Sequence, residues 1–262
     1  MRLSRALLAT AATAAVALST TATAFAAPAA VNYAAVGDSY AAGVGTQSSY
    51  DNSCDRSAKG YPSLWAAAHS VSAFTNVACT GAKTSDVINS QVGSLSAANT
   101  VVTVTIGGND AGFTNTMESC ILGGDSGCNT AVNNAKAFVG STLPGLLDNT
   151  YNAIRGHAPN ATVYVVGYPR FYQIGGSCSV GLSDTSRGYI NSGADALDSA
   201  ISAAASRHGF RFVDVRTAFT NHGICSSSSW LNSVTLPVVN SYHPNSSGYA
   251  SGYLPTLTAV TG

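Results

Sequence analysis

The chain has little charge of either sign. Asp, Glu, Lys and Arg make up 9% of its 262 residues, 12 basic side chains stand against 12 acidic ones, and no block of like charge occurs. Binding to nucleic acid or to an anionic membrane needs a concentrated basic surface, so we expect neither partner. The exterior must consist largely of Ser, Thr, Asn, Gly and Tyr. Such a surface can approach a neutral lipid or polymer without desolvating many charges, and it is equally compatible with a simply solvated exterior.

The sequence also lacks the spacings typical of metal sites. No Cys-x-x-Cys pair and no His-x-x-x-His pair occurs. Because bound zinc and related metals are usually held by ligands at such short spacings, we expect no metal site.

No apolar run is long enough to span a bilayer. The run over residues 6–18 falls short of the roughly 20 residues that a spanning helix needs. It follows two arginines and precedes Ala24-Phe25-Ala26, the order typical of a secretory signal peptide. We therefore expect a signal peptide over residues 1–26 and an extracellular protein without a membrane anchor. Residues 27–262 contain no repeat or linker, so we expect them to form one domain. We also expect the protein to be a monomer.

Six cysteines lie in this expected mature chain: Cys54, Cys79, Cys120, Cys128, Cys178 and Cys225. In a secreted chain an even count implies disulfides, and six thiols allow 15 pairings. We expect the nearest neighbours along the chain to pair, because each bridge would close a segment rich in Gly, Ser and Asn that few apolar contacts can hold. The chain-entropy model gives roughly 2.5 to 4 kcal/mol per bridge for such loops.

Apolar runs alternate with helical patterns along the chain. Strands are expected over residues 31–37, 71–79, 100–106, 162–167 and 211–215, and helices over 62–69, 84–89, 129–155 with a break near Pro144, 184–208 with Asp184 as its cap, and 246–260. Strands that are apolar on both faces and alternate with long helices predict an α/β fold, a parallel sheet covered by helices on both sides. Ligands of such folds bind beyond the carboxyl ends of the strands.

Three short strings carry reactive side chains: Gly37-Asp38-Ser39-Tyr40, Gly107-Gly108-Asn109-Asp110 and Ser241-Tyr242-His243-Pro244. Together they supply a hydroxyl, an amide donor and an imidazole, the minimum set for hydrolysing an ester by acyl transfer. Alone, Ser39 would be a helix cap, Asn109 a turn residue and His243 a surface histidine. Asp38 has a structural role in this interpretation, because adjacent side chains diverge at the end of a strand.

In this order, and with Gly81 between the first two, the strings resemble the conserved blocks of the GDSL or SGNH hydrolases. The resemblance covers the mature chain, including its cysteine spacing, and is nearest in style to secreted Streptomyces lipases, esterases and phospholipases. It implies a flavodoxin-like three-layer fold. It also implies an acyl-enzyme on Ser39 with His243 as general base, an oxyanion hole formed by Ser39, Gly81 and Asn109, and no metal or cofactor.

The sequence departs from the family pattern at the group that orients the imidazole. The family usually carries Asp three residues before the histidine, where this chain has Asn240. A neutral amide cannot stabilise an imidazolium as a carboxylate does. We expect a Ser-His dyad whose imidazole N–H donates to the backbone carbonyl of Asn240 or Ser241, as in some secreted actinobacterial members, with Asp214 as the alternative.

The other histidines show no reactive neighbours in the sequence. His69, His157 and His208 lie in or at the ends of expected helices, and His222 stays open as an alternative because it lies in the loop between Cys178 and Cys225.

Apolar residues in or beside the expected loops indicate the substrate class: Tyr40, Phe113, Met117, Ile121, Leu122, Phe171, Tyr172 and Ile174. If they gather into an acyl groove, the ester is a lipid, either triacylglycerol or glycerophospholipid. If they only cover the sheet, they say nothing of the substrate. Two other interpretations of the same cleft also stay open. One is a catalytically silent lipid- or glycan-binding module, and the other is a carbohydrate acetyl esterase.

Overall fold

The structure is a computed structural model that describes residues 30–47, 50–51, 53–178 and 181–262. The expected signal peptide over residues 1–26 lies outside the described residues. Five strands form one sheet: β1 (Val31–Gly37), β2 (Val71–Asn76), β3 (Val101–Thr105), β4 (Thr162–Val166) and β5 (Arg211–Val213). Their order is β2-β1-β3-β4-β5, and every neighbouring pair is parallel. This is the flavodoxin-like order that the resemblance implies.

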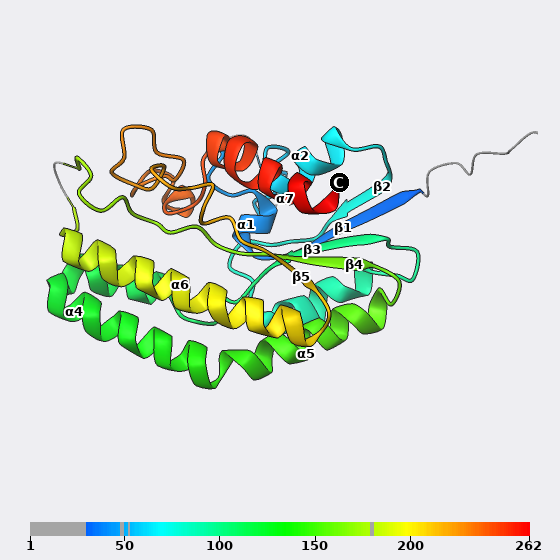
Figure 1. Ribbon diagram of the computed structural model, residues 1–262, viewed down its shortest axis with the longest axis horizontal. Coiled ribbons are helices and arrows are strands. Elements are labelled where there is room, and N and C mark those ends of the chain that lie inside the picture. Colours follow the sequence, from blue (N-terminus) through cyan, green and yellow to red (C-terminus); the bar gives the residue numbers. More distant parts are fainter. Residues whose placement is uncertain (1–29, 48–49, 52, 179–180) are drawn as a thin grey trace, which may run out of the picture.

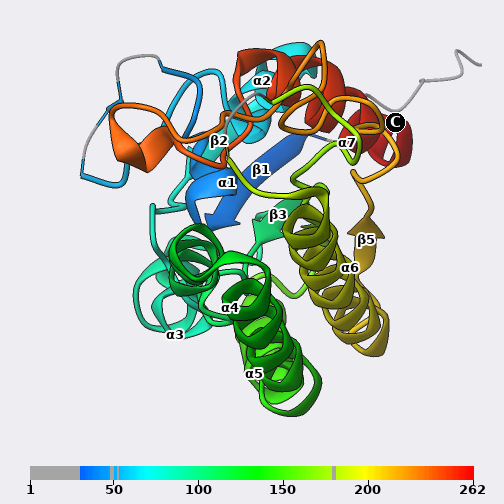
Figure 2. The ribbon, with the colours of Figure 1, turned by 90° about the vertical axis from the view of Figure 1, so that its left-hand side faces the viewer.

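Helices cover both faces of the sheet, as the sequence predicts. One face carries α1 (Ser39–Ala42), α2 (Tyr61–Ala68) and α7 (Leu254–Thr261), and the other carries α3 (Thr84–Asp86), α4 (Phe113–Ser141), α5 (Leu143–His157) and α6 (Asp184–Arg207) (Figures 1 and 2). Short π- and 3-10-helical segments also occur: η1 (Val87–Gln91), η2 (Val92–Ser94), η3 (Val238–Asn240) and η4 (Gly248–Tyr253). The central strands are buried between these layers, with Val36, Val104 and Val165 fully inaccessible.

The strand order fixes where a ligand can bind. The chain leaves β1 toward β2 on one side, and β3 then pairs with the other side of β1. The point where the winding reverses therefore lies between β1 and β3, and crevices of doubly wound sheets form there, beyond the carboxyl ends of the strands. Ser39 follows β1 and Asn109 follows β3, so both lie at this crevice.

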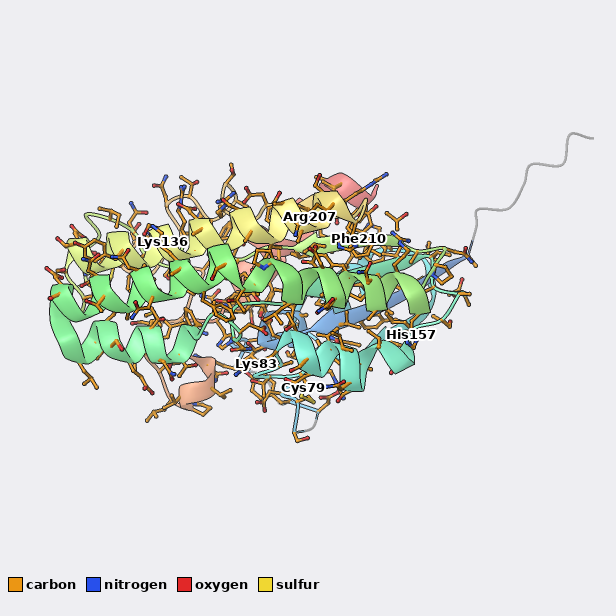
Figure 3. The ribbon with its side chains drawn as sticks, turned by 90° about the horizontal axis from the view of Figure 1, so that it is seen from below. Cys79, Lys83, Lys136, His157, Arg207 and Phe210 are labelled. Atoms are coloured by element: carbon orange, nitrogen blue, oxygen red, sulfur yellow. A yellow bond between two sulfur atoms is a disulfide. The ribbon has the colours of Figure 1, made fainter. Side chains whose placement is uncertain are left out.

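Helix α4 differs from the prediction. It begins at Phe113 rather than near Asn129, so Phe113, Met117 and Ile121 are helical rather than in loops. Gly124 breaks it with non-helical angles (φ 57°, ψ −161°), and the two runs lie side by side (Figure 3). Glycine has a low helix propensity, so Gly123, Gly124 and Gly127 left this part of the sequence without a helical signal. Packing of one face into the core stabilises it instead, since Met117, Cys120 and Cys128 are buried.

Several boundaries also move, each for a local reason. Ser183, not Asp184, caps α6 by accepting a hydrogen bond from the N–H of Ser186 at 3.1 Å. The last helix is π-helical up to Tyr253, and Pro255 then falls in the first turn of α7, where its missing N–H costs nothing. Strand β5 ends at Val213, so Asp214 lies beyond it.

The six cysteines form three disulfides in the pairing that the sequence predicts. Cys54 is bonded to Cys79, Cys120 to Cys128 and Cys178 to Cys225. The second bridge joins the two runs of α4, and the first ties the segment after α1 to the segment that carries Gly81. Within the described ranges, no helix is both long and apolar enough to cross a bilayer.

Candidate active site

The backbone at the carboxyl end of β1 packs closely against β3, and this positions Ser39. Gly37 has φ 128°, and a Cβ there would lie 2.2 Å from the carbonyl oxygen of Thr105 on the neighbouring strand, so only glycine fits. Asp38 then caps α1 by accepting from the N–H of Tyr40 at 2.9 Å. Ser39 becomes the first residue of that short helix, at the carboxyl edge of the sheet.

His243 reaches the same point from the other end of the chain. Its Nε2 lies 2.7 Å from Ser39 Oγ, and its Nδ1 lies 2.9 Å from the carbonyl oxygen of Ser241. A carbonyl only accepts, so Nδ1 carries the proton and donates to it, which leaves the Nε2 lone pair facing the serine hydroxyl. This is the arrangement that general-base catalysis requires.

The two other candidates for orienting the imidazole are engaged elsewhere. The Asn240 side chain accepts a hydrogen bond from the Tyr50 hydroxyl, and its carbonyl accepts from Asn232 Nδ2 at 3.2 Å. Asp214 accepts from Arg216 Nε at 2.9 Å and Nη2 at 2.5 Å. The carbonyl of Ser241 is therefore the acceptor that the structure places on the ring.

Asn232 holds the His243 loop and had no signal in the sequence. Its N–H donates to the His243 carbonyl at 2.9 Å, its own carbonyl accepts from the N–H of Tyr242 at 3.0 Å, and its Nδ2 donates to the Gly45 carbonyl at 2.8 Å. Tyr40 adds a further bond, because its buried hydroxyl donates to the Tyr242 carbonyl at 2.6 Å. These contacts fix the loop although Tyr242 has a left-handed backbone (φ 63°).

The electrostatic surroundings keep His243 neutral. Burial of the ring lowers the pKa of His243 to about 4, with the hydrogen bond to the Ser241 carbonyl acting in the opposite direction. Desolvation disfavours the charged imidazolium, and no carboxylate among the described residues bonds to the ring to restore it. The imidazole is therefore free to accept a proton at neutral pH.

The expected oxyanion donors border the same cavity. Ser39, Gly81, Asn109 and His243 all line it. Asn109 Nδ2 donates one hydrogen to the Ala82 carbonyl at 2.9 Å and keeps a second for a ligand. Gly81 is exposed with φ 74°, and a side chain at this position would meet open space.

Asp110 and Tyr168 connect the loops that carry these donors. The Asp110 carboxylate accepts from the Thr84 hydroxyl at 2.6 Å and from the Thr84 N–H at 3.0 Å, which ties the Asn109 turn to the Gly81 loop. The Tyr168 hydroxyl donates to Asp38 at 2.5 Å and accepts from the Gly108 N–H at 3.2 Å. Burial raises the pKa of Asp38 to about 7. The Asp38 carboxylate thus accepts hydrogen bonds from Tyr40 and Tyr168 and makes none to His243.

The cavity beside Ser39 has a volume of about 450 Å³, within the usual range for small-molecule sites. Tyr40, Phe113, Met117, Ile121 and Phe171 line it, as the groove interpretation predicts, whereas Leu122, Tyr172 and Ile174 do not. The larger part of its apolar wall had no signal in the sequence: Val132 and Val139 of α4, Ile190 and Leu197 of α6, and Val234, Val238 and Val239 before His243.

The remaining histidines lie apart from Ser39. His69 contacts the Trp65 carbonyl, His208 contacts Asp148, and His222 stacks on Trp230 with ring centroids 3.6 Å apart. In the part of the chain that the structure describes, no group of three or more His, Cys, Asp or Glu side chains could hold a metal ion.

Comparison with known proteins agrees with this geometry. The sequence matches the model of the GDSL-like lipase/acylhydrolase family over residues 35–251. It is 50% identical to a lipase of Streptomyces rimosus, covering 88% of this chain and 87% of the relative. The crystal structure of an extracellular lipase from Streptomyces rimosus superposes with a TM-score of 0.86 at 50% identity, covering 88% of this chain and all of that one. Phospholipase A1 of Streptomyces albidoflavus superposes with a TM-score of 0.85 at 51% identity, covering 88% and 99%. The chain therefore belongs to the GDSL-like lipase/acylhydrolase family and is an ester hydrolase.

Proposed function

We propose that this chain is a secreted serine hydrolase that cleaves the carboxylic esters of lipids through an acyl-enzyme on Ser39. The observation that carries the proposal is the 2.7 Å contact between Ser39 Oγ and His243 Nε2 at the wall of an apolar cavity. Triacylglycerol and glycerophospholipid are both substrates of this class, and the similar Streptomyces proteins include a lipase and a phospholipase A1.

In the acylation step, His243 Nε2 takes the proton of Ser39 while Oγ attacks the carbonyl carbon. The electron pair of the C=O bond moves to its oxygen, and the N–H groups of Ser39 and Gly81 and the Asn109 amide donate to that oxyanion. When the carbonyl re-forms, the alkoxide leaves with the proton from Nε2. Water then repeats the sequence on the acyl-enzyme and releases the acid.

The Ser241 carbonyl takes the place of the carboxylate in this mechanism. It accepts from Nδ1–H at 2.9 Å and so fixes both the tautomer and the plane of the ring. A carbonyl dipole stabilises the imidazolium less than a full negative charge does. Burial lowers the pKa of His243 to about 4, and the hydrogen bond to the Ser241 carbonyl offsets only part of that effect.

Secretion and a monomeric state belong to the same proposal. Three disulfides suit an oxidising compartment, and the similar Streptomyces rimosus lipase is described as extracellular. Sequencing the amino terminus of protein recovered from the culture medium tests the expected cleavage near Ala26, and sedimentation in solution tests the monomer.

The catalytic part is tested with p-nitrophenyl esters from acetyl to palmitoyl, assayed beside a phospholipid and a triacylglycerol. Ser39→Ala and His243→Ala should each lower kcat/KM by about 10³-fold or more. Asp214→Asn is the matched control: Asp214 binds Arg216 rather than His243, so this variant should retain most activity. Turnover of no ester at any chain length would favour the silent binding module. Turnover confined to acetyl esters and acetylated sugars would favour the carbohydrate acetyl esterase.

A further inference from the structure

Large exposed apolar side chains lie at residues that line the cavity, or one or two positions away from such residues. Five large ones come from two segments: Ile121 (48% exposed) and Leu122 (86%) of α4, and Val234 (63%), Leu236 (82%) and Val238 (68%) of the segment before His243. We call these five residues the apolar rim. Contiguous exposed apolar surface is costly in water and marks interaction sites on soluble proteins.

The rim is continuous with the interior of the cavity. Ile121, Val234 and Val238 are largely exposed and also line the cavity that reaches Ser39. An acyl chain that passes from outside the protein to the serine would therefore contact apolar surface along its whole path. Leu122 and Leu236 lie outside the cavity lining, so they cannot contact a single bound ester from within it.

The rim carries almost no net charge. Residues 217–262, which include Val234, Leu236 and Val238, contain no Asp, Glu, Lys or Arg. On α4, Glu118 and Lys136 also border the cavity and carry opposite charges. Asp125, three residues after Leu122, adds one negative charge, so no cluster of basic residues lies beside Leu122 on this helix. Recruitment to anionic membranes depends on clusters of Lys and Arg beside the apolar surface. The partner that matches the rim is therefore an uncharged or zwitterionic surface.

We propose that the apolar rim docks onto the neutral surface of a lipid aggregate, so that Leu122 and Leu236 insert into the lipid and the cavity mouth opens toward it. This inference rests on the proposed function, because it names how that site meets its substrate. A second copy of the chain seated on the rim would close the mouth that the ester must enter. A lipid surface instead presents the ester at that mouth.

The experiment measures flotation with phosphatidylcholine vesicles. It is done with the Ser39→Ala protein, so that the lipid stays intact. Leu122→Ser and Leu236→Ser should each lower the vesicle partition constant about tenfold, since each removes an isobutyl group from the lipid contact. Val260→Ser is the matched control. Val260 is also exposed (41%) but lies on α7, outside the rim, so its replacement should change the partition constant less than about twofold.

A second arm uses proteins that keep Ser39. On dissolved p-nitrophenyl acetate, the double variant Leu122→Ser/Leu236→Ser should match the parent kcat/KM within about twofold, which shows that it is folded. On emulsified palmitoyl ester, the double variant should be slower than the parent, because it binds the lipid surface more weakly. If the parent hydrolyses no ester, the proposed function fails, while flotation of the Ser39→Ala protein still reports on docking.

Four outcomes would overturn the docking proposal. The double variant could float as well as the Ser39→Ala protein, or Val260→Ser could lose binding to the same extent. The parent could also bind no vesicle and form a dimer that the double variant dissociates, which would make the rim an interface between copies. Binding that requires anionic lipid would equally contradict it, because residues 217–262, which include Val234, Leu236 and Val238, contain no Lys or Arg to attract such lipid.

Discussion

The ionisation of His243 sets the acid limit of the proposed reaction. Only a neutral imidazole can take the proton of Ser39, and burial lowers the pKa of His243 to about 4. At pH 5 a group with that pKa is about nine-tenths neutral, whereas an exposed histidine with a pKa of about 6.5 is only about one-thirtieth neutral. At pH 5 the fraction of enzyme with a neutral imidazole should therefore be about 30-fold higher than for an ordinary histidine, and kcat/KM should hold its plateau value to lower pH.

The assay is kcat/KM for a dissolved short-chain ester across the acid range, because this ratio reports ionisation of the free enzyme. We expect an acid limb with its midpoint near pH 4, and a midpoint near 6.5 would refute the reasoning. Burial raises the pKa of Asp38 to about 7, so Asp38 titrates inside the assayed range. In the Asp38→Asn variant, any limb of the kcat/KM profile with a midpoint near pH 7 should disappear, while the limb with a midpoint near pH 4 should remain.

Unfolding must be separated from titration in this experiment. The folded protein keeps His243 neutral down to about pH 4, whereas the unfolded chain binds a proton below about 6.5. Between these values the unfolded state holds more protons, so stability falls as the pH is lowered through this window. A sample held at an acid pH and then returned to neutral pH should recover full activity. Only the acid pH values at which recovery is complete are used to fit the midpoint of the kcat/KM profile.

Three further predictions follow from other parts of the structure. Asp214→Asn should change kcat/KM less than about threefold, since Asp214 binds Arg216 rather than His243; a loss of several orders of magnitude would contradict the Ser241 assignment. A Cβ at Gly193 of α6 would meet only Val132 at 3.5 Å beside the cavity, so Gly193→Leu should abolish turnover of long acyl chains and spare acetyl esters. Gly188→Leu, whose side chain would meet open space, should leave the chain-length profile unchanged. Burial raises the pKa of Asp198 to about 8, so between about pH 4 and 8 the folded state holds a proton that the unfolded chain has released. This group therefore lowers stability as the pH rises through that window, and the decline levels off above about pH 8. Asp198→Asn should flatten that decline in urea unfolding, and an unchanged slope would contradict the assigned pKa.

Local patterns in the sequence determined the sheet and the ends of its strands. Continuous apolar runs ending in Gly or Asp identified β1, β3 and β4 because a buried parallel strand is apolar on both faces and stops where the chain must turn. The same edge rule brought Ser39 and Asn109 to one crevice. The short segments rich in Gly, Ser and Asn were enough to choose one cysteine pairing among many.

Only the tertiary structure decided how the imidazole is held and what surrounds it. The Tyr40 hydroxyl bonds to the Tyr242 carbonyl across 202 positions of the chain, and His243 reaches Ser39 across 204. Asn232, which hydrogen-bonds to that loop, carries no periodic pattern. The first run of α4, before Gly124, lines part of the cavity and carries none either. Periodicity reports which face of an element is buried, whereas the geometry of a loop depends on hydrogen bonds between distant segments that form only when the chain has folded.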